Sequence, residues 1–415
     1  MERRNWRVAA IRSEHIVELP LEGIKVLDFS QVAFGPVCTR LLGDLGADII
    51  KVEPLEGEFS RLTSRRKGES MAFLCSNRGK RDLCLNLNDP RGKEIALKLA
   101  KDTDVLVQSF TPGVMERLGL DYKTVSAINP QVIYASFSMY GDNGPFRHRR
   151  GGDPWAQAFT GVVASQGSPD GPPYLAGHLF IDWTGAALNA FAITSAVLLR
   201  ERGGPGQELT NNLVNTGVYI QDAAICTYLN DGVLLKKSGR GNAQSMFPYG
   251  AYPAKDGDVV TIFGQDDDEW VTLCSILGIE DLLQDPRYDT AVNRTKRKFE
   301  LYPILDEAFR KRTRAEWEQL FRENKLRCDP CLNYAELVEH PQFKANNMVI
   351  DMDHPSEGKL KMLGSPIQFK GIPPSRATKP PPLLGEHTRE IMEGLGYSPE
   401  DIIQLREEGV VGYLD

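Results

Sequence analysis

Asp182 is the residue of this sequence best placed to do covalent chemistry. It lies in the segment 177–185, directly before the most apolar stretch of the chain, residues 185–199. Asp is a preferred N-cap, so one interpretation is that its carboxylate only caps the following helix. The other is that Ile181 and Trp183 partly desolvate the carboxylate, while the helix N-terminus keeps it ionised. Such a carboxylate is a competent nucleophile toward an activated acyl group.

Basic residues gather in the segment 77–81, Asn-Arg-Gly-Lys-Arg, and Arg117 follows later in the chain. Short charge runs are common in solvated loops, which is the simpler interpretation. The alternative is a binding site for the phosphates of an anionic ligand, held by charge-assisted hydrogen bonds.

Other reactive residue types lack the spacing that their chemistry requires. Cys328 and Cys331 have the spacing of a redox motif, but they follow a predicted helix and no second pair completes a zinc site. The six histidines stand apart, and neither a zinc-protease motif nor a serine-nucleophile elbow occurs. We therefore expect no metal site.

The elements that must position Asp182 begin with an alternation of strand and helix signals over residues 23–140. Helices are predicted over 35–46 and 89–99. Strands are predicted at 24–29, 48–52, 83–85, 105–107 and 132–137. This alternation predicts an α/β fold with a parallel sheet. The glycine fingerprint of dinucleotide-binding folds does not follow the first strand, and no Walker A sequence occurs.

A second section begins near residue 232. Residues 249–262 read as a hairpin around an Asp-Gly turn, and Thr313 with Glu316 forms a capping box. These signals predict a smaller α/β domain over 232–342. Two helices are expected near the end of the chain, over 388–395 and 399–408.

Composition narrows the class of protein. The 415 residues carry a net charge of −7, which does not build the basic surface that nucleic acids require. Seven scattered cysteines favour a reducing compartment, so we expect a cytoplasmic protein. The stretch 185–199 is too short to span a bilayer and is interpreted as a buried helix; no membrane partner is expected. Residues 1–18 lack the apolar region of a signal peptide and are interpreted as a loosely ordered arm.

Several motifs in order resemble those of the family III CoA-transferases, which include formyl-CoA transferase and carnitine CoA-transferase. The resemblance extends from about residue 19 to residue 411. It rests on residues 21–29, Gly35-Pro36, 45–53, Asn77 to Arg81, Phe110-x-Pro112-Gly113, Arg117-x-Gly119, 203–207 and 384–388.

The resemblance implies a fold and an assembly. It implies a Rossmann-like large domain built from both chain ends and a small α/β domain inserted between them. The large domain would comprise 19–231 and the C-terminal part of 343–415, which also contains a linker. Two such ring-shaped subunits would interlock as a dimer. The partner would be a second copy or a homologous subunit.

The resemblance also implies the chemistry. Asp182 corresponds to the family's nucleophilic aspartate, which attacks an acyl-CoA thioester to form an aspartyl anhydride and then an aspartyl-CoA thioester. The substrates would be an acyl-CoA and a free carboxylic acid, with no permanently bound cofactor and no metal.

CoA is expected to lie along one set of residues that the resemblance implies. These are Val32, Ala33, Phe34, Leu85, Asn86, Asn88, Phe110, Arg117 and Tyr140. The chain departs from formyl-CoA transferases at Ala33, Ser109 and Ser138, where those enzymes carry Gln, Asn and Lys, and its segment 239–244 is less rich in glycine. We therefore expect an acid larger than oxalate, with aromatic and long-chain acids included, and succinyl-CoA as a plausible donor.

Two alternatives stay open. The α-methylacyl-CoA racemases share the implied fold, but they use a His as base where this chain has Gly152, and glycine cannot act as a base. The chain could also be a non-catalytic subunit of a heteromeric CoA-transferase, although its retention of Asp182 argues against that.

Overall fold

The computed structural model describes residues 19–63, 68–237, 239–241, 246–257, 259–263, 266–370 and 379–414. The predicted N-terminal arm, residues 1–18, and residues 242–244 of the segment 239–244 lie outside these residues.

The largest sheet in the described part of the chain has seven strands in the order β12-β3-β2-β1-β4-β5-β6. All neighbours pair in parallel except β12, which runs antiparallel to β3. The strands are β1 (Lys25–Asp28), β2 (Asp48–Glu53), β3 (Arg81–Leu85), β4 (Val105–Gln108), β5 (Ile133–Ser138), β6 (Gln207–Asn212) and β12 (Val411–Gly412). The strand order reverses between β1 and β4, so the carboxyl ends of these two strands form the switch point where open α/β sheets bind ligands.

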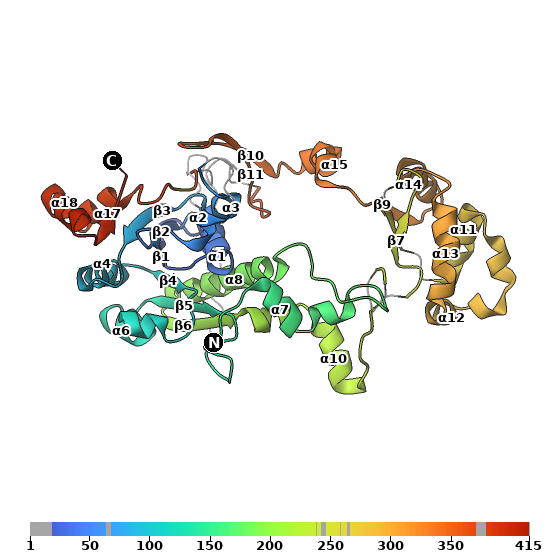
Figure 1. Cartoon of the computed structure of the whole chain (residues 1–415), viewed down its shortest axis with the longest axis horizontal. Helices are drawn as coiled ribbons and strands as arrows, with labels where there is room; N and C mark the ends of the chain where they lie inside the picture. Colours follow the sequence, from blue (N-terminus) through green and yellow to red (C-terminus); the bar gives the residue numbers. More distant parts are fainter. Residues whose placement is uncertain are drawn as a thin grey trace, which may run out of the picture. The chain divides into compact units, whose positions relative to one another are not determined.

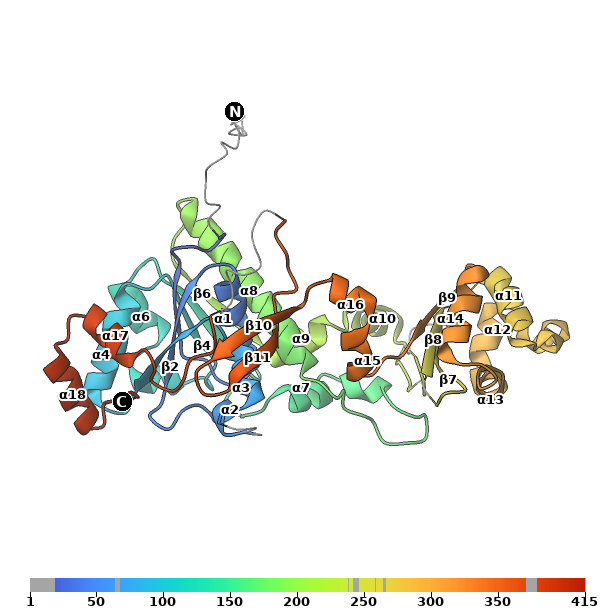
Figure 2. The same cartoon turned by 90° about the horizontal axis from the view of Figure 1, so that it is seen from above.

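Helices cover both faces of this sheet (Figures 1 and 2). On one face α4, α6, α17 and α18 pack on the strands through a continuous apolar core. On the other face α1 packs against α8. The helices associated with the sheet are α1 (Phe34–Asp44), α2 (Phe59–Leu62), α3 (Met71–Asn77), α4 (Pro90–Lys101), α5 (Val114–Leu118), α6 (Tyr122–Ile128), α8 (Phe180–Glu201), α17 (Thr388–Gly394) and α18 (Pro399–Glu407). A hairpin of β10 (Val349–His354) and β11 (Gly358–Leu363) packs against Leu74 of α3.

The chain divides into two compact units. Unit 1 comprises residues 1–153, 179–216 and 347–415, and unit 2 comprises 154–178 and 217–346. The predicted boundaries differ from this division. They placed 154–178 and 217–231 with the first part of the large domain, and 343–346 with the linker and C-terminal part. The assignment of the units as a large and an inserted domain stays a prediction.

Unit 2 is built on a three-stranded antiparallel sheet of β7 (Gly250–Pro253), β8 (Val259–Phe263) and β9 (Arg327–Pro330). Its core is aromatic, with Trp270, Phe309 and Trp317 buried together. Its remaining helices are η1 (Val162–Ser165), α10 (Asp222–Asp231), α11 (Asp267–Leu277), η2 (Glu280–Gln284), η3 (Pro286–Tyr288), α12 (Ala291–Lys296), α13 (Lys298–Phe309), α14 (Arg314–Glu323), α15 (Tyr334–Glu339) and α16 (Pro341–Ala345). Two further helices, α7 (Asp153–Phe159) and α9 (Leu213–Tyr219), each contain a boundary between the units.

Local sequence signals account for most of these elements. Asp89 caps α4 by accepting the N–H of Arg91, with Pro90 in the first turn, and Thr313 forms the predicted capping box with Glu316. The predicted strands, the parallel sheet, the hairpin and the two C-terminal helices are confirmed.

The prediction that residues 185–199 form a buried helix is wrong for one face of α8. Ile181, Ala186 and Ile193 are buried, whereas Phe191 is 72% exposed and Leu198 is also exposed. By length and composition alone α8 could cross a membrane, and half of its apolar window is buried inside the fold.

Candidate active site

Two adjoining cavities lie at the carboxyl ends of β1 and β4. The first, which we call the aspartate cavity, has a volume of about 600 Å³. It is lined by Gln31, Val32, Ala33, Phe34, Ser109, Phe110, Thr111, Pro112, Val114, Arg117, Phe137, Ser138, Met139, Arg149, Arg150, Gly151, Gly152, Asp182 and Leu213. The second, which we call the asparagine cavity, has a volume of about 460 Å³. It is lined by Phe29, Gln31, Val52, Glu53, Pro54, Leu55, Glu56, Leu85, Asn86, Leu87, Asn88, Lys93, Phe110, Val114, Arg117 and Leu118. Four residues, Gln31, Phe110, Val114 and Arg117, line both cavities, so the two adjoin.

Asp182 lies inside the first turn of α8, and it is not the N-cap of that helix. The helix begins at Phe180, and Leu179 occupies the N-cap position. The backbone N–H of Asp182 donates to Asp153 Oδ2 at 2.9 Å, so Asp153 provides the capping carboxylate. The interpretation of Asp182 as an N-cap is therefore wrong, and its own carboxylate lines the aspartate cavity.

The electrostatics of Asp182 also differ from the prediction. Its side chain is 6% exposed. Burial, followed by the negative charge of Asp153, raises the pKa of Asp182 from 3.8 to about 7. The sequence led us to expect that the helix N-terminus would keep this group ionised. Because desolvation and a like charge outweigh that effect, about half of the carboxyl groups are protonated near neutral pH.

The turn of α8 that carries Asp182 packs closely against α1. A Cβ placed on Gly185 would lie 2.2 Å from Phe34 Cε2 and 2.9 Å from Thr216 Oγ1, so only glycine fits there. The ring of Phe34 packs in turn against Phe137, with 5.7 Å between centroids. This contact fixes the start of α1 against the helix turn that carries Asp182.

The structure brings most of the predicted CoA-contact residues together around the two cavities. Val32, Ala33 and Phe34 line the aspartate cavity, and Leu85, Asn86 and Asn88 line the asparagine cavity. Phe110 and Arg117 line both. Tyr140 lines neither cavity, and its ring packs edge-on against Phe146 with 5.5 Å between centroids.

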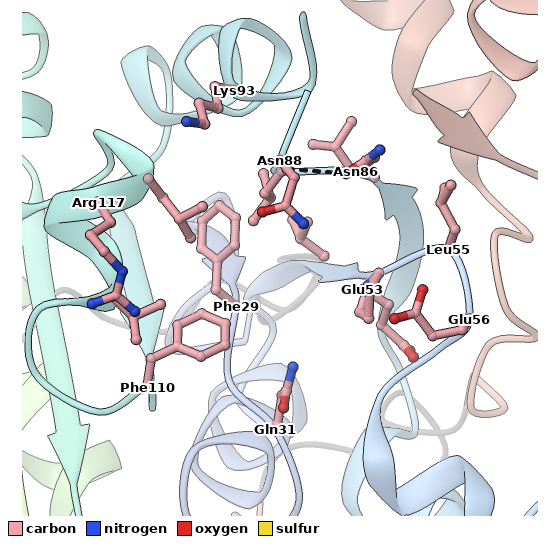
Figure 3. A pocket seen from close by; sticks show the side chains of 16 residues that line it. Phe29, Gln31, Glu53, Leu55, Glu56, Asn86, Asn88, Lys93, Phe110 and Arg117 are labelled. Atoms are coloured by element: carbon pink, nitrogen blue, oxygen red, sulfur yellow. Dashed lines mark hydrogen bonds between the residues drawn. The ribbon is translucent and has the colours of Figure 1, made fainter. Parts of the chain in front are cut away.

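Figure 3 shows the asparagine cavity from close by. Phe29 and Phe110 project into its middle, with Arg117 beside Phe110. The N–H of Asn88 donates to Asn86 Oδ1 at 3.1 Å, and Arg117 Nη1 donates to Gly113 O at 2.9 Å. Flat apolar rings next to cationic and amide groups suit a ligand that combines an aromatic base with phosphates.

Sequence reasoning did not select several residues that line the two cavities. Lys93 and Gln31 line the asparagine cavity, and Arg149 and Arg150 line the aspartate cavity. The basic pair Arg149-Arg150 next to Gly151-Gly152 was the available signal. Lys93 carried no distinguishing signal.

Comparison with known proteins gives the family of this chain. The model of CoA-transferase family III matches residues 21–388. The chain belongs to CoA-transferase family III. It is 35% identical to the succinyl-CoA:glutarate CoA-transferase of Mus musculus over 94% of this chain and 90% of that protein. It is 32% identical to the formyl-CoA:oxalate CoA-transferase of Streptomyces avermitilis, over 94% of this chain and 99% of that protein. The family and these relatives support its assignment as an acyl-CoA:carboxylate CoA-transferase.

A solved structure agrees with this assignment. A CAIB/BAIF family protein from Brucella suis matches 91% of this chain and 100% of its own length at 30% identity, with a TM-score of 0.80. The mixed α/β fold with its mainly parallel sheet is thereby shared with a solved member of the CAIB/BAIF family.

The basic family motif at residues 77–81 supports the fold. Arg78 and Lys80 are buried in ion pairs, so the interpretation of this segment as a solvated loop is wrong for them, and their charges are not available to the phosphates of the alternative interpretation. Lys80 is buried and its Nζ donates to Asp28 Oδ2 at 2.9 Å, to Asn77 Oδ1 at 2.8 Å and to Pro36 O at 3.0 Å. Arg78 pairs with a buried aspartate, Asp44. Arg81 pairs with Asp48 and Glu390. These basic side chains form ion pairs within the protein, because Asp28, Asp44, Asp48 and Glu390, which are distant from them in sequence, lie next to them in the fold.

The residue that replaces the racemase base is part of the aspartate cavity. Gly152 lines this cavity, and no histidine is among the described residues that do so.

Among the described residues, no group of three or more His, Cys, Asp and Glu could hold a metal ion. Burial raises the pKa of Cys328 to about 12, with the charge of Asp329 adding to it, so this thiol is a poor nucleophile at neutral pH.

Proposed function

We propose that this enzyme transfers CoA from an acyl-CoA donor to a free carboxylic acid through covalent intermediates on Asp182. The observation that carries this proposal is the placement of a desolvated carboxylate in a cavity at the switch point of the sheet, next to a second cavity that shares four lining residues with it. A carboxylate that is poorly hydrated attacks an activated acyl group more readily than one in water.

The reaction requires four exchanges of acyl bonds. The ionised carboxylate of Asp182 attacks the thioester carbonyl; a C–O bond forms, the C–S bond breaks, and CoA leaves as its thiolate. The thiolate attacks the aspartyl carbonyl of the resulting anhydride, which releases the donor acid and leaves an aspartyl-CoA thioester. The acceptor carboxylate then attacks this thioester, displaces the CoA thiolate and forms a second anhydride. In the last exchange the thiolate attacks the acceptor's carbonyl and restores Asp182. Every step exchanges one activated acyl bond for another, so no ATP is consumed.

We propose that CoA lies along the asparagine cavity and that its thioester reaches the aspartate cavity. Support comes from the predicted contact residues, which line these two cavities with the exception of Tyr140. Arg117 and Lys93 supply positive charge for the phosphates of CoA. Because anhydrides hydrolyse, the burial of Asp182 also limits the access of water.

We propose an acyl donor and acceptor with a second carboxylate, such as succinyl-CoA and a dicarboxylic acid longer than oxalate. Arg150 lines the aspartate cavity and is exposed, so its guanidinium is available to an anionic group. The mouse relative is named for succinyl-CoA and glutarate, both of which carry such a group. The small residue Ala33 leaves room for these longer acids.

We propose a dimer of two copies, interlocked as the family resemblance implies. The outer face of α8 exposes Trp183, Phe191 and Leu198, which are about two helical turns apart, and exposed apolar surface of this kind favours an interface. Phe191→Asp should yield a monomer by light scattering, while Val271→Asp, on an exposed apolar position of α11, should leave the dimer intact. A dimeric Phe191→Asp variant would contradict this interface.

A cytoplasmic location also stays a proposal, which rests on the few, scattered cysteines of the sequence.

Intact-protein mass spectrometry tests the central step. The enzyme is mixed with succinyl-CoA, and a mass increase equal to CoA, or a succinyl group trapped by hydroxylamine, is expected in the wild type and absent in Asp182→Asn. Asp153→Asn, which removes a neighbouring carboxylate, should still form the adduct. An adduct that persists in Asp182→Asn would refute the assignment. Tight CoA binding with no adduct from any donor would favour a racemase or a non-catalytic subunit.

A further inference from the structure

The backbone at Val32 is strained and lies at the wall of the aspartate cavity. Val32 has a φ of 69°, in the left-handed region that β-branched residues avoid. It is 41% exposed and lines the cavity that contains Asp182. A conformation of this kind persists only where the surroundings hold it, and it is concentrated at functional sites.

Two hydrogen bonds to the backbone hold this loop. The N–H of Val32 donates to Glu58 Oε2 at 3.0 Å, and the N–H of Gln31 donates to Ser109 Oγ at 3.0 Å. Glu58 is 1% exposed and is the N-cap of α2, where the N–H and the hydroxyl of Ser60 donate to its two oxygens at 3.2 and 2.6 Å. The carboxylate therefore joins α2 to the loop that follows β1.

A buried lysine compensates the charge of Glu58. Lys51 Nζ lies 3.8 Å from Glu58 Oε1, and both side chains are fully buried. The same ammonium group donates to Ser30 O at 2.9 Å, two residues before Val32. Burial lowers the pKa of Lys51, but the charges of Glu58, Glu53 and Asp28 outweigh it and keep the lysine cationic. One buried ion pair thus contacts the loop at Ser30 and at Val32.

We infer that Glu58 is a positioning residue, whose buried carboxylate sets the backbone of Val32 and with it the wall of the aspartate cavity. The loop continues directly into Phe34, which packs against Gly185, one helical turn beyond Asp182. Without the acceptor at Glu58, residue 32 relaxes toward an ordinary negative φ and the segment 31–34 shifts. The effect on catalysis rests on the proposed function, whereas the effect on the backbone does not.

Amide hydrogen exchange tests the backbone role independently of any reaction. The peptide that contains residues 30–34 should be protected in the wild type and in Glu58→Gln, whose amide oxygen still accepts a hydrogen bond. In Glu58→Ala this peptide should exchange roughly tenfold faster. The matched control is Asp44→Asn, which breaks a buried ion pair with Arg78 that lines neither cavity and should leave this peptide unchanged. Equal protection in Glu58→Ala and the wild type would overturn the inference.

A double-mutant cycle with Val32→Gly then connects the backbone to catalysis. Glu58→Ala should slow formation of the acyl-enzyme by about tenfold to a hundredfold, the scale expected for an ångström of misplacement. In the Val32→Gly background the same substitution should cost much less, because glycine adopts a positive φ without strain.

The outcomes of the cycle are distinct. An equal cost of Glu58→Ala in both backgrounds would show that Glu58 acts otherwise than through the backbone of Val32, and would refute the inference. A wild type that forms no adduct would refute the proposed function, and the exchange experiment alone would then decide the role of Glu58.

Discussion

Replacement of the proposed nucleophile by its neutral isostere should stabilise this protein while abolishing its covalent chemistry. The pKa of Asp182 is raised from 3.8 to about 7, so the folded state retains a proton that the unfolded chain releases above pH 3.8. The stability contributed by this retained proton is complete below pH 3.8 and is lost progressively up to about pH 7. Above pH 7 the folded protein contains an ionised, buried carboxylate next to Asp153.

The size of the effect follows from the shift. About three pKa units at 1.36 kcal/mol each give a penalty of about 4 kcal/mol near pH 8. Near pH 4.5 the same linkage gives only about 1 kcal/mol. Asp182→Asn has no proton to lose, so its stability relative to the wild type should grow by about 3 kcal/mol between these two pH values.

Urea denaturation of both proteins at several pH values measures this difference. The control is Asp121→Asn at the N-cap of α6, because its shift has the opposite sign. Burial acts to raise the pKa of Asp121, but hydrogen bonds from Thr124 outweigh it and lower the pKa. The stability that this carboxylate contributes is complete above its unfolded pKa of 3.8 and is lost only at lower pH, so the difference between this variant and the wild type should stay nearly constant between pH 4.5 and 8. The reasoning on Asp182 is refuted if Asp182→Asn and the wild type keep a constant difference in unfolding free energy across this range.

Three further predictions concern the same site. In single-turnover mass spectrometry, the rate of acyl-enzyme formation should rise with pH through about 7 as Asp182 ionises. In Asp153→Asn this rise should move to lower pH, because a like charge is gone. A pH profile that does not move would contradict the role of Asp153. Arg150→Ala should raise the KM for succinyl-CoA far more than that for butyryl-CoA, and an equal effect on both donors would place the second carboxylate elsewhere. Gly185→Ala should destabilise the fold by about 1–3 kcal/mol in urea, because its Cβ would collide with the ring of Phe34; unchanged stability would contradict the packing of α1 on α8.

Residues close in sequence were enough to predict much of the fold. The apolar runs at 24–29 and 105–107 became adjacent parallel strands, because a buried strand needs only local β-formers with helices on both sides. Thr313 and Glu316 formed the capping box three residues apart. Asp182 could be selected because an aspartate before a long apolar helix is a local pattern.

Contacts between residues that are far apart in the sequence could not be predicted. Asp153 caps the helix of Asp182 from 29 residues away, and burial, followed by this like charge, raises the pKa of Asp182. Lys80 and Arg78 looked like surface charges, because nothing in their own segment shows that Asp28 and Asp44 pair with them. Both faces of α8 carry apolar residues, so the apolar character of the segment did not show that one face would be exposed.

The raised pKa of Asp182 destabilises the free enzyme near neutral pH, but it suits the proposed reaction. Near neutral pH about half of the groups are protonated, which lowers the rate of attack only about twofold. In return, a carboxylate with a higher pKa is a stronger nucleophile, and the best balance between the two lies near the working pH. When the carboxylate forms the anhydride, its negative charge passes to the departing CoA thiolate, and both the burial and the repulsion from Asp153 cease to oppose it. Burial and the charge of Asp153 destabilise the ionised acid in the folded protein, and they therefore favour its acylated state. The same interactions thus weaken the fold and accelerate the covalent step.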